Sequence, residues 1–368
     1  MPDEPDLTRP HVALPPATRA GKPLTRVLAA GGAGFVGSHV CDALVANGVH
    51  VVCVDNLVTG RPENVAHLAK SPLFTFLEQD AAVPTAGLAP LDAVLHLASP
   101  ASPQDFDRLS VETLQAGSHV THTLLNLAVE HGARFLLAST SEVYGDALEH
   151  PQREDYWGNV NPIGPRSVYD EGKRYAESLV TAYRHRHGVD SVIVRIFNTY
   201  GPRMRPDDGR CVPNFITGAL AQDALTIHGD GKQTRSLCFV DDLVRGLLAA
   251  VASGHHGPIN LGNPDEDTIV NLAQRIITLC GSSSSMRFVG AAPDDPRQRC
   301  PDTSVARKVL DWSPQVDKEE GLARTIEWFR SHRPAGRADA GEAREHDHGH
   351  DRGPGQAHTH AEGAKARS

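Results

Sequence analysis

The first half of the chain alternates short apolar runs with longer stretches in which apolar side chains recur at helical spacing. The apolar runs predict six strands, at residues 26–32, 50–55, 73–80, 91–98, 133–139 and 191–197. The stretches between them predict helices, among them residues 36–48, 121–132 and 169–188. Strands that are apolar throughout are buried on both faces, so this alternation predicts an α/β fold with a doubly wound parallel sheet covered by helices.

The pattern of long elements ends after the sixth predicted strand, where proline-rich loops separate shorter elements. We therefore expect one folded region at residues 24–333, with a core at about 24–200 and an interleaved, smaller substrate-binding part at about 201–333. Residues 1–23 are polar and rich in proline, which is typical of a flexible arm. Residues 334–368 hold many histidines and no large apolar side chain. They cannot bury enough surface to offset the entropy of ordering, so we expect a disordered tail.

Charge and hydropathy restrict the partners and the location. The 368 residues carry a formal net charge of −9, which argues against a nucleic-acid partner because phosphate binding needs a basic face. No stretch of about 18 apolar residues occurs, so neither a membrane span nor a membrane partner is expected. The six cysteines are scattered without a CxxC pair. Their spacing therefore indicates neither a zinc site nor a disulfide framework, and the chain is expected to be cytoplasmic.

A glycine-rich turn follows the first predicted strand in the sequence GGAGFVG. Gly31, Gly34 and Gly37 let the backbone turn tightly and approach a pyrophosphate, which then lies at the positive end of the next helix. Asp55 ends the second predicted strand, where a carboxylate accepts hydrogen bonds from ribose hydroxyls and would repel a 2′-phosphate. The arrangement is typical of a Rossmann-type NAD site. The expected cofactor contacts are Gly31, Gly34, Phe35, Val36, Gly37, Asp55, Asn56, Asp80 and Leu97.

A tyrosine and a lysine in YDEGK indicate the chemistry. Tyr169 and Lys173 are four residues apart and so share one face of the long predicted helix, where both are also expected to contact the cofactor. A phenol has a reference pKa of about 10, and lowering it by about three units needs roughly 4 kcal/mol of preferential stabilisation of the phenolate. A neighbouring ammonium and the cationic nicotinamide of NAD⁺ can supply this. Thr140 and Glu142 follow the fifth predicted strand, at the edge of the sheet where ligand groups gather.

These residues together resemble the extended short-chain dehydrogenase/reductase superfamily, the NAD-dependent epimerases and dehydratases, in which Ser or Thr, Tyr and Lys oxidise a sugar hydroxyl with NAD⁺. Longer blocks narrow the resemblance. They are HLASPASP (96–103), LLASTSEVYGD (136–146), YWGNVNPIGPRSVYDEGKR (156–174), RIFNTYGPRM (195–204), GDGKQTRS (229–236) and DDPRQRCPD (294–302). In wording and order they are similar to the UDP-glucuronate decarboxylases, which form UDP-xylose, over about residues 25–330.

The resemblance implies a reaction on the sugar of UDP-glucuronate. Tyr169 would take the proton of the C4 hydroxyl while hydride passes from C4 to NAD⁺, with Thr140 hydrogen-bonded to the same oxygen. The 4-keto acid loses CO₂ readily because the carboxylate lies β to the ketone, and NADH then reduces C4 again, so no metal is required. Glu142 corresponds to an essential acid near C5 and C6, which transfers a proton directly or through water. Arg299 corresponds to an arginine at the sugar's carboxylate end.

The same resemblance implies the remaining substrate contacts and the assembly. The expected substrate-binding residues are Pro100, Ser141, Asn198, Arg203, Asn214, Arg235 and Arg299. A homodimer is implied, paired through helices at about residues 110–131 and 169–187. The sequence departs from the family pattern at Phe106, where Tyr is usual, and at Gly117, where Asn is usual. One contact near the sugar and one near the cofactor are therefore expected to differ.

Three other functions stay open from the sequence. A nucleotide-sugar 4,6-dehydratase also places Glu after its Thr, but usually has Asp where Ser141 stands. A UDP-glucuronate 4-epimerase is disfavoured, because a simple epimerase needs no second acid such as Glu142. A non-catalytic, NAD-binding regulatory protein would have lost Tyr169, Lys173 or Thr140, and all three are present.

Overall fold

The computed structural model describes residues 18–19, 22–290 and 298–332. All of these residues except His332 belong to one compact unit of the chain, Met1–Ser331. The expected N-terminal arm, except for its last few residues, and the expected tail at 334–368 lie outside the described residues. None of the described helices is both long enough and apolar enough to cross a bilayer.

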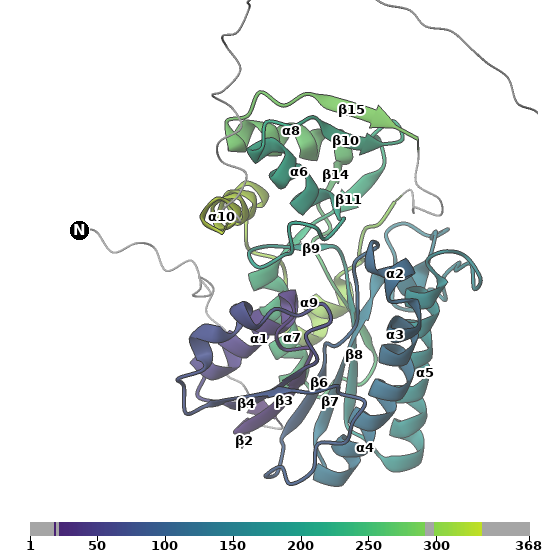
Figure 1. The fold of residues 1–368 in the computed structure, drawn as a ribbon. Coiled ribbons are helices and arrows are strands. Elements are labelled where there is room, and N and C mark those ends of the chain that lie inside the picture. Colours follow the sequence, from purple (N-terminus) through teal and green to yellow (C-terminus); the bar gives the residue numbers. More distant parts are fainter. Residues whose placement is uncertain (1–17, 20–21, 291–297, 333–368) are drawn as a thin grey trace, which may run out of the picture. The chain divides into compact units, whose positions relative to one another are not determined.

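A seven-stranded sheet forms the centre of this unit, in the order β13-β8-β7-β6-β3-β4-β5, and every neighbouring pair is parallel. Its strands are β3 (Arg26–Ala30), β4 (His50–Asp55), β5 (Phe74–Glu78), β6 (Ala93–His96), β7 (Arg134–Thr140), β8 (Ser191–Ile196) and β13 (Pro258–Leu261). The chain runs outward from β3 to β5, returns to β6 beside β3, and then builds outward in the other direction (Figure 1). This confirms the predicted doubly wound, Rossmann-type fold.

One strand of the sheet, β13, was missed by the sequence patterning. The segment holds only four residues and lies between Gly257 and Gly262, so it is too short to give a periodic signal. It pairs with β8, with Ile259 opposite Val194, and so extends the sheet by one strand at the edge away from the glycine-rich turn.

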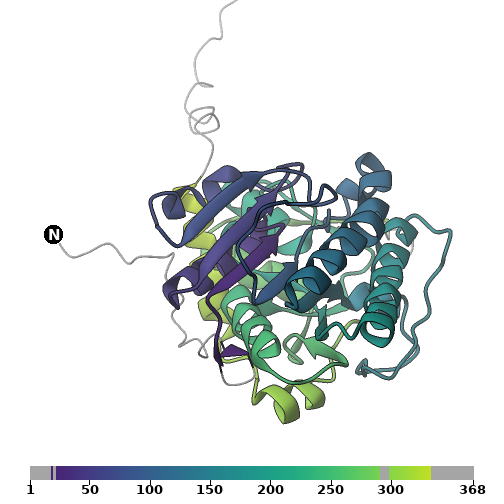
Figure 2. The ribbon, with the colours of Figure 1, turned by 90° about the horizontal axis from the view of Figure 1, so that it is seen from below.

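Helices cover both faces of the sheet (Figure 2). The side chains of each strand alternate between two separate cores. The main helices are α1 (Phe35–Ala46) and α7 (Val240–Ala252) on one face, and α4 (Thr121–His131) and α5 (Ser167–His187) on the other. In β3, Val27 and Ala29 enter the core shared with α1 and α7, whereas Leu28 and Ala30 enter the core shared with α4 and α5. Burial on both faces is the physical reason that these strands are apolar throughout.

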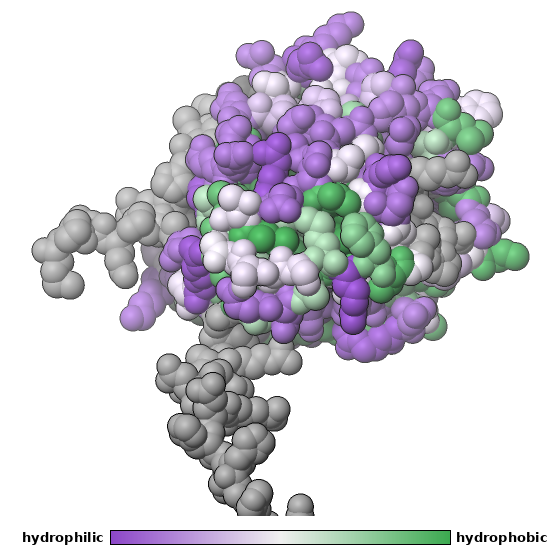
Figure 3. All heavy atoms as spheres, turned by 90° about the horizontal axis from the view of Figure 1, so that it is seen from above, coloured by the Kyte–Doolittle hydropathy of each residue, from purple (hydrophilic) through white to green (hydrophobic). Residues whose placement is uncertain are grey.

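The chain after β8 adds small sheets and helices, and Figure 1 shows α6, α8, β10 and β15 gathered at one end of the parallel sheet. The elements are β9 (Thr199–Tyr200), α6 (Cys211–Leu220), β10 (Leu225–His228), β11 (Thr234–Ser236), β12 (Cys238–Phe239), β14 (Glu266–Thr268), α8 (Ile269–Cys280), β15 (Met286–Val289), α9 (Ser304–Leu310) and α10 (Lys318–Ser331). β10 pairs with β15, β11 with β14, and β9 with β12. Seen from this end, the surface is largely hydrophilic, with apolar patches in its middle and along one edge (Figure 3).

Shorter elements complete the described chain. They are the antiparallel pair β1 (Thr18–Arg19) and β2 (Lys22–Pro23), the helices α2 (Asp105–Arg108) and α3 (Ser110–Gln115), and 3₁₀ turns at Pro62–Asn64, Ala66–Leu68 and Ser141–Tyr144. A π-helical turn at Ala116–Val120 joins α3 to α4. The helix predicted at 121–132 therefore continues a helical run that begins at Ser110.

Gly117 in the π-helical turn lies directly against the backbone of α5. A Cβ atom at Gly117 would come within 2.3 Å of the carbonyl oxygen of Gly172. Gly172 lies on α5 between Tyr169 and Lys173. The missing side chain at Gly117 therefore sets the distance between α3 and the helix that carries the predicted catalytic residues.

Gly117→Ala should destabilise the protein by about 1–3 kcal/mol, because the new methyl group overpacks a contact between two backbones. Urea denaturation measures the free energy of unfolding. Gly172→Ala is the matched control, since a Cβ there meets no atom closer than 3.6 Å. The higher helix propensity of Ala should stabilise that variant by up to about 1 kcal/mol. Equal stability of the two variants would contradict this interpretation of the contact.

Candidate active site

A cleft of about 840 Å³ lies at the carboxyl ends of the parallel strands. Its wall includes the glycine-rich turn after β3, the end of β7, the first turns of α5 and parts of α6 and β11. The core of the fold and the later small elements therefore both contribute to it. In open α/β sheets this edge, beside the point where the strand order reverses, is where ligands bind.

The glycine-rich turn fits the pyrophosphate of a dinucleotide. Gly31 has a φ of 79°, and its N–H donates to the Val54 carbonyl oxygen at 2.8 Å. A Cβ at Gly31 would lie 2.6 Å from backbone atoms of Ala98, and one at Gly37 would lie 2.0 Å from the Gly31 carbonyl oxygen. Gly34 is the N-cap of α1 and leaves the helix N-terminus without a side-chain cap. Backbone N–H groups are thus free of side-chain cover where an anion would approach.

The acidic residues predicted to bind the cofactor lie beside this turn. The Asp55 carboxylate accepts hydrogen bonds from the backbone N–H groups of Ala33 at 3.0 Å and Leu57 at 2.9 Å. Burial raises its pKa, and these two hydrogen bonds act in the opposite direction. Asn56 donates to Asp80 at 3.2 Å, so both are next to Asp55 at the ends of β4 and β5. Their contacts with ribose and adenine stay predictions.

The predicted redox residues come together inside the cleft. Tyr169 lies in the first turn of α5, and Lys173 lies one turn later, with its ammonium nitrogen 5.8 Å from the centre of the Tyr169 ring. The ammonium donates to the Ala138 carbonyl oxygen at 2.8 Å, which ties α5 to β7. Thr140 ends β7, and its hydroxyl acts on the Tyr169 phenol so as to lower the pKa of that group. The Ser/Thr, Tyr and Lys arrangement is therefore present in space as well as in sequence.

The protein groups alone do not lower the pKa of the tyrosine. Burial raises the pKa of Tyr169 to about 12, although the hydrogen bond with Thr140 and the charge of Arg210 oppose the rise. Burial also lowers the pKa of Lys173 to about 8, with Glu177 opposing. For Tyr169 to act as a base, its pKa must be lowered by a further positive charge. The cationic nicotinamide, which the sequence analysis named beside the lysine, is the charge expected to do this.

Phe106, one of the two departures from the family pattern, covers Tyr169, the predicted catalytic base. Its ring is stacked on that of Tyr169, with centroids 5.1 Å apart and planes inclined by 18°. The Arg166 guanidinium lies 5.9 Å from the centre of the Phe106 ring. Phe106 is buried, so it excludes water from one face of Tyr169 and contributes to the burial that raises the phenol's pKa.

A buried ion cluster surrounds the second predicted acid. Arg299 donates from both terminal nitrogens to the two oxygens of Glu142, one of them at 2.7 Å, and Arg166 lies 2.8 Å from the same carboxylate. Burial by itself would raise the pKa of Glu142, but the two guanidinium groups outweigh it and lower the pKa to about 2. Glu142 is therefore held ionised. This favours a role in orienting water or shaping the field over direct donation of a proton.

Sequence reasoning missed Arg166 and Asp170. Both lie in the quoted block YWGNVNPIGPRSVYDEGKR, at the start of α5, but neither side chain was singled out. Asp170 is buried, and one of its carboxylate oxygens has no hydrogen-bond partner within the described residues. Burial and the charge of Glu142 raise the pKa of Asp170 to about 7. The site thus holds two nearby carboxyl groups whose pKa values are displaced in opposite directions.

Most predicted substrate residues reach the cleft. Its wall includes Ser141, Asn198, Arg203, Asn214, Arg235 and Arg299, whereas Pro100 is not part of it. The wall also contains Arg205 and Arg210, which the sequence analysis did not select. Arg203 pairs with Asp42 at 2.8 Å, and Arg210 with Asp208 at 2.8 Å. With seven cationic and four acidic side chains, the wall is suited to an anionic ligand.

Residues 27–262 match the family model described as "NAD dependent epimerase/dehydratase family". UDP-glucuronic acid decarboxylase 3 of Arabidopsis thaliana is 50% identical over 310 residues, which cover 84% of this chain and 90% of the relative. UDP-glucuronic acid decarboxylase 1 of Danio rerio is 49% identical over 304 residues, which cover 83% of this chain and 72% of the relative.

Solved structures with the same fold bind nucleotide ligands. UDP-glucose 4-epimerase of Thermotoga maritima, solved with UDP-glucose, aligns with a TM-score of 0.77 and 30% identity over 83% of this chain and 99% of that chain. UDP-glucuronic acid 4-epimerase of Bacillus cereus, solved with UDP-glucuronic acid and NAD, aligns with a TM-score of 0.75 and 29% identity over 83% and 99%. A dTDP-glucose 4,6-dehydratase of Streptomyces venezuelae, solved with NAD, aligns with a TM-score of 0.77 and 30% identity over 84% and 98%.

The raised pKa of Asp170 predicts a pH-dependent stability. A carboxyl group with a raised folded-state pKa contributes stability below its ordinary pKa and loses that contribution as the pH rises through about 7. Asp170→Asn keeps the neutral shape, so its melting temperature should gain on the wild type as the pH rises from about 4 to about 7, by about 2 °C per kcal/mol recovered, whereas the difference at about pH 4 should be small. The exposed Asp107, changed to Asn, is the control. A pH-independent difference for Asp170→Asn would contradict the assignment.

Proposed function

The chain belongs to the NAD-dependent epimerase/dehydratase family, and on that premise we propose that it decarboxylates UDP-glucuronate to UDP-xylose with bound NAD. The observation that carries the proposal is the pairing of two groups in one cleft. Thr140, Tyr169 and Lys173 provide the redox group found in the family. Glu142, with Arg299 beside it, provides charges suited to the carboxylate end of a sugar acid. The relatives at about 50% identity named as UDP-glucuronic acid decarboxylases support the same activity.

The redox group performs the first proton transfer. NAD, held by Gly31, Gly34 and Gly37 of the glycine-rich turn, would supply the acceptor and later the donor of the C4 hydride. Tyr169, once ionised, takes the proton of the C4 hydroxyl, and the Thr140 hydroxyl donates a hydrogen bond to the same oxygen. Lys173 holds α5 against β7 through Ala138, so the phenol stays within reach of Thr140. Two oxygens held this close together can both act on one reacting atom.

The same two hydroxyl groups stabilise the decarboxylation step. In the 4-keto sugar the C6 carboxylate lies β to the ketone, so the electrons of the breaking C5–C6 bond enter an enolate whose oxygen is on C4. Tyr169 now donates a hydrogen bond to that oxygen, together with Thr140, which is an oxyanion-hole role. A proton then adds to C5, and reduction at C4 completes the xylose ring.

The ion cluster controls the carboxylate end of the sugar. Arg299 and Arg166 share the one carboxylate of Glu142, so the cluster carries one net positive charge, which suits the carboxylate end of the sugar. Glu142 offsets one of the two guanidinium charges and so limits how strongly the arginines stabilise the substrate carboxylate against loss of CO₂. With its pKa lowered to about 2, Glu142 acts on C5 by orienting a water molecule. Asp170, with its pKa raised to about 7, is the nearby carboxyl group that can hold a proton.

The decisive experiment follows the products of UDP-glucuronate by mass spectrometry, comparing the wild type with Glu142→Gln. The wild type should form UDP-xylose and CO₂, and the variant should lose about 100-fold or more in kcat while keeping its NAD content. Glu171→Gln is the matched control, because it makes the same change on the half-exposed side of α5 and leaves the cleft intact. Melting temperatures test whether each variant folds.

Other products would contradict the proposal in distinct ways. UDP-galacturonate formed without loss of mass would indicate a 4-epimerase. Loss of water from a nucleotide-activated glucose, with no turnover of UDP-glucuronate, would indicate a 4,6-dehydratase. Full activity of Glu142→Gln would leave decarboxylation standing but would overturn the role of the ion cluster.

We also propose that the protein is a homodimer paired through α3 and α5. Both helices expose large apolar side chains: on α3, Val111 is 59% and Leu114 42% exposed, and on α5, Tyr175 is 53% exposed. Clusters of this kind are commonly covered in an interface. The two helices pack against each other within one subunit, so a second copy related by a two-fold axis would complete a four-helix bundle.

The double change Leu114→Glu with Tyr175→Glu should convert the dimer to a monomer, because it buries charges without partners in the proposed interface. Light scattering coupled to gel filtration measures the mass. Phe288→Glu is the control, since Phe288 is 54% exposed but lies on β15. A wild type that is monomeric, or a variant that keeps the wild-type mass, would refute the proposed interface.

A further inference from the structure

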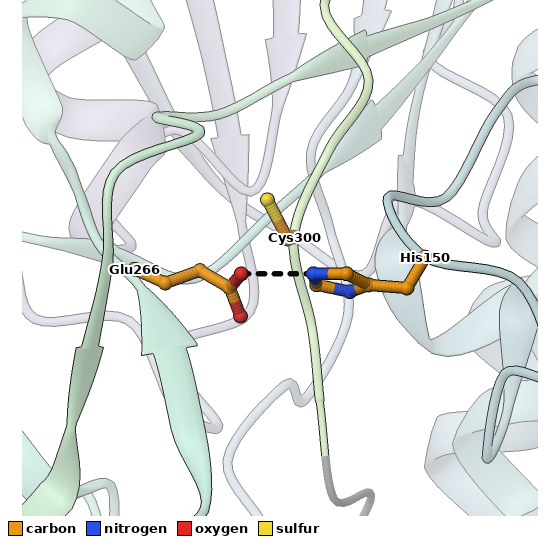
Figure 4. A group of neighbouring side chains, drawn as sticks. All are labelled: His150, Glu266 and Cys300. Atoms are coloured by element: carbon orange, nitrogen blue, oxygen red, sulfur yellow. Dashed lines mark ion pairs between the residues drawn. The ribbon is translucent and has the colours of Figure 1, made fainter.

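Three side chains with metal-binding chemistry meet outside the catalytic cleft. His150 precedes Pro151 in the loop after β7, Glu266 begins β14, and Cys300 directly follows Arg299. Their ligand atoms all lie within 4.8 Å of one another, and Figure 4 shows the His150 ring and the Glu266 carboxylate facing each other beside the segment that carries Cys300. The residues are far apart in the sequence, so cysteine spacing gave no sign of the cluster.

Neighbouring groups hold the cluster in place. The His150 Nε2 lies 2.9 Å from Glu266 Oε2, and the other oxygen of Glu266 accepts a hydrogen bond from the Thr234 hydroxyl at 2.6 Å. Gln152 binds the Cys300 backbone twice, accepting from its N–H at 2.8 Å and donating to its carbonyl oxygen at 2.8 Å. Hydrogen-bond partners of this kind orient the ligand side chains in natural metal sites.

The donor set suits zinc or a similar transition metal. One thiol, one imidazole nitrogen and one carboxylate oxygen are ligands of Zn²⁺, with bonds of about 2.0–2.3 Å. Tetrahedral geometry then separates the donor atoms by about 3.5 Å, so the observed positions need only small side-chain adjustments.

Charge and access also favour a cation at this point. Asp265, Asp302 and Glu266 all act on Cys300 as negative charges, and no cation is among the main influences on its thiol. Lys318 is nearby but pairs with Asp265 at 2.9 Å. His150 and Cys300 line a surface pocket of about 710 Å³, whose wall also includes Arg307 and Lys308. The pocket gives an ion and one water molecule a path to the ligands.

We propose that His150, Glu266 and Cys300 bind one Zn²⁺-like ion, with a water molecule from the pocket as the fourth ligand. On binding, the Cys300 thiol gives its proton to solvent, and the His150 and Glu266 side chains exchange their mutual contact for bonds to the ion. The ion joins β14, the loop after β7 and the segment that carries Arg299. It therefore stabilises the wall of the catalytic cleft without touching the substrate.

Cobalt(II) titration of the purified full-length protein tests the site, because a thiolate bound to Co²⁺ gives a charge-transfer absorption that histidines cannot produce. The histidine-rich tail therefore does not contribute to this signal. The wild type should show the band at one equivalent per chain, Cys300→Ser should lose it, and His150→Ala should weaken Co²⁺ binding by about tenfold or more. Cys280→Ser, which removes a thiol on α8, is the matched control and should keep the band.

Thermal unfolding gives an independent measurement. Zn²⁺ should raise the melting temperature of the wild type and of Cys280→Ser, but not that of Cys300→Ser. His150 is exposed, so the fold of His150→Ala should survive and its altered affinity stays interpretable. The proposal is overturned if no charge-transfer band appears at saturating Co²⁺, or if the band and the Zn²⁺-dependent shift persist in Cys300→Ser.

Discussion

A buried carboxylate held by two arginines joins the separate parts of the fold around the cleft. Glu142 lies just beyond β7 of the parallel sheet, Arg166 just before α5, and Arg299 far later in the chain. Buried charges are tolerated when they are paired, and loss of one partner leaves the others uncompensated at a cost of about 3–5 kcal/mol. The cluster therefore fixes the distance between the sheet and the later elements. The same three charged side chains also determine the electrostatic field in the cleft.

The catalytic tyrosine depends on a similar balance between packing and charge. Phe106 covers its ring, and burial raises its pKa, so Tyr169 is protonated in the protein alone. We therefore expect Tyr169 to ionise and act as a base only when the cationic cofactor is bound. This links proton abstraction to the presence of the hydride acceptor, and an enzyme that must not release an oxidised sugar without reducing it again benefits from such a link.

The fold was predictable because its strands are apolar throughout and its glycines stand at positions where the backbone leaves no room for a side chain. The same applies to Tyr169 and Lys173, whose helical spacing places them together. β13 was not predictable, because four residues between glycines give no periodic signal. The partners of Glu142 were also beyond local patterns, since Arg299 meets it only through the tertiary fold. Asp170 was not selected for a different reason. An acid in the first turn of a helix ordinarily interacts favourably with the helix dipole, and the raised pKa of Asp170 follows only from its burial beside Glu142 in the folded chain.

The contact between Gly117 and Gly172 has a consequence for how this protein can vary in evolution. Any side chain at Gly117 would push α5 outward, and Tyr169 and Lys173 would move with it, away from Thr140 and Ala138 on β7. The position of the helix that carries Tyr169 and Lys173 therefore depends on a residue in the π-helical turn, whose added Cβ would meet backbone atoms of Gly172 first. The two positions constrain each other, because a larger residue at Gly117 needs the two helices to lie further apart.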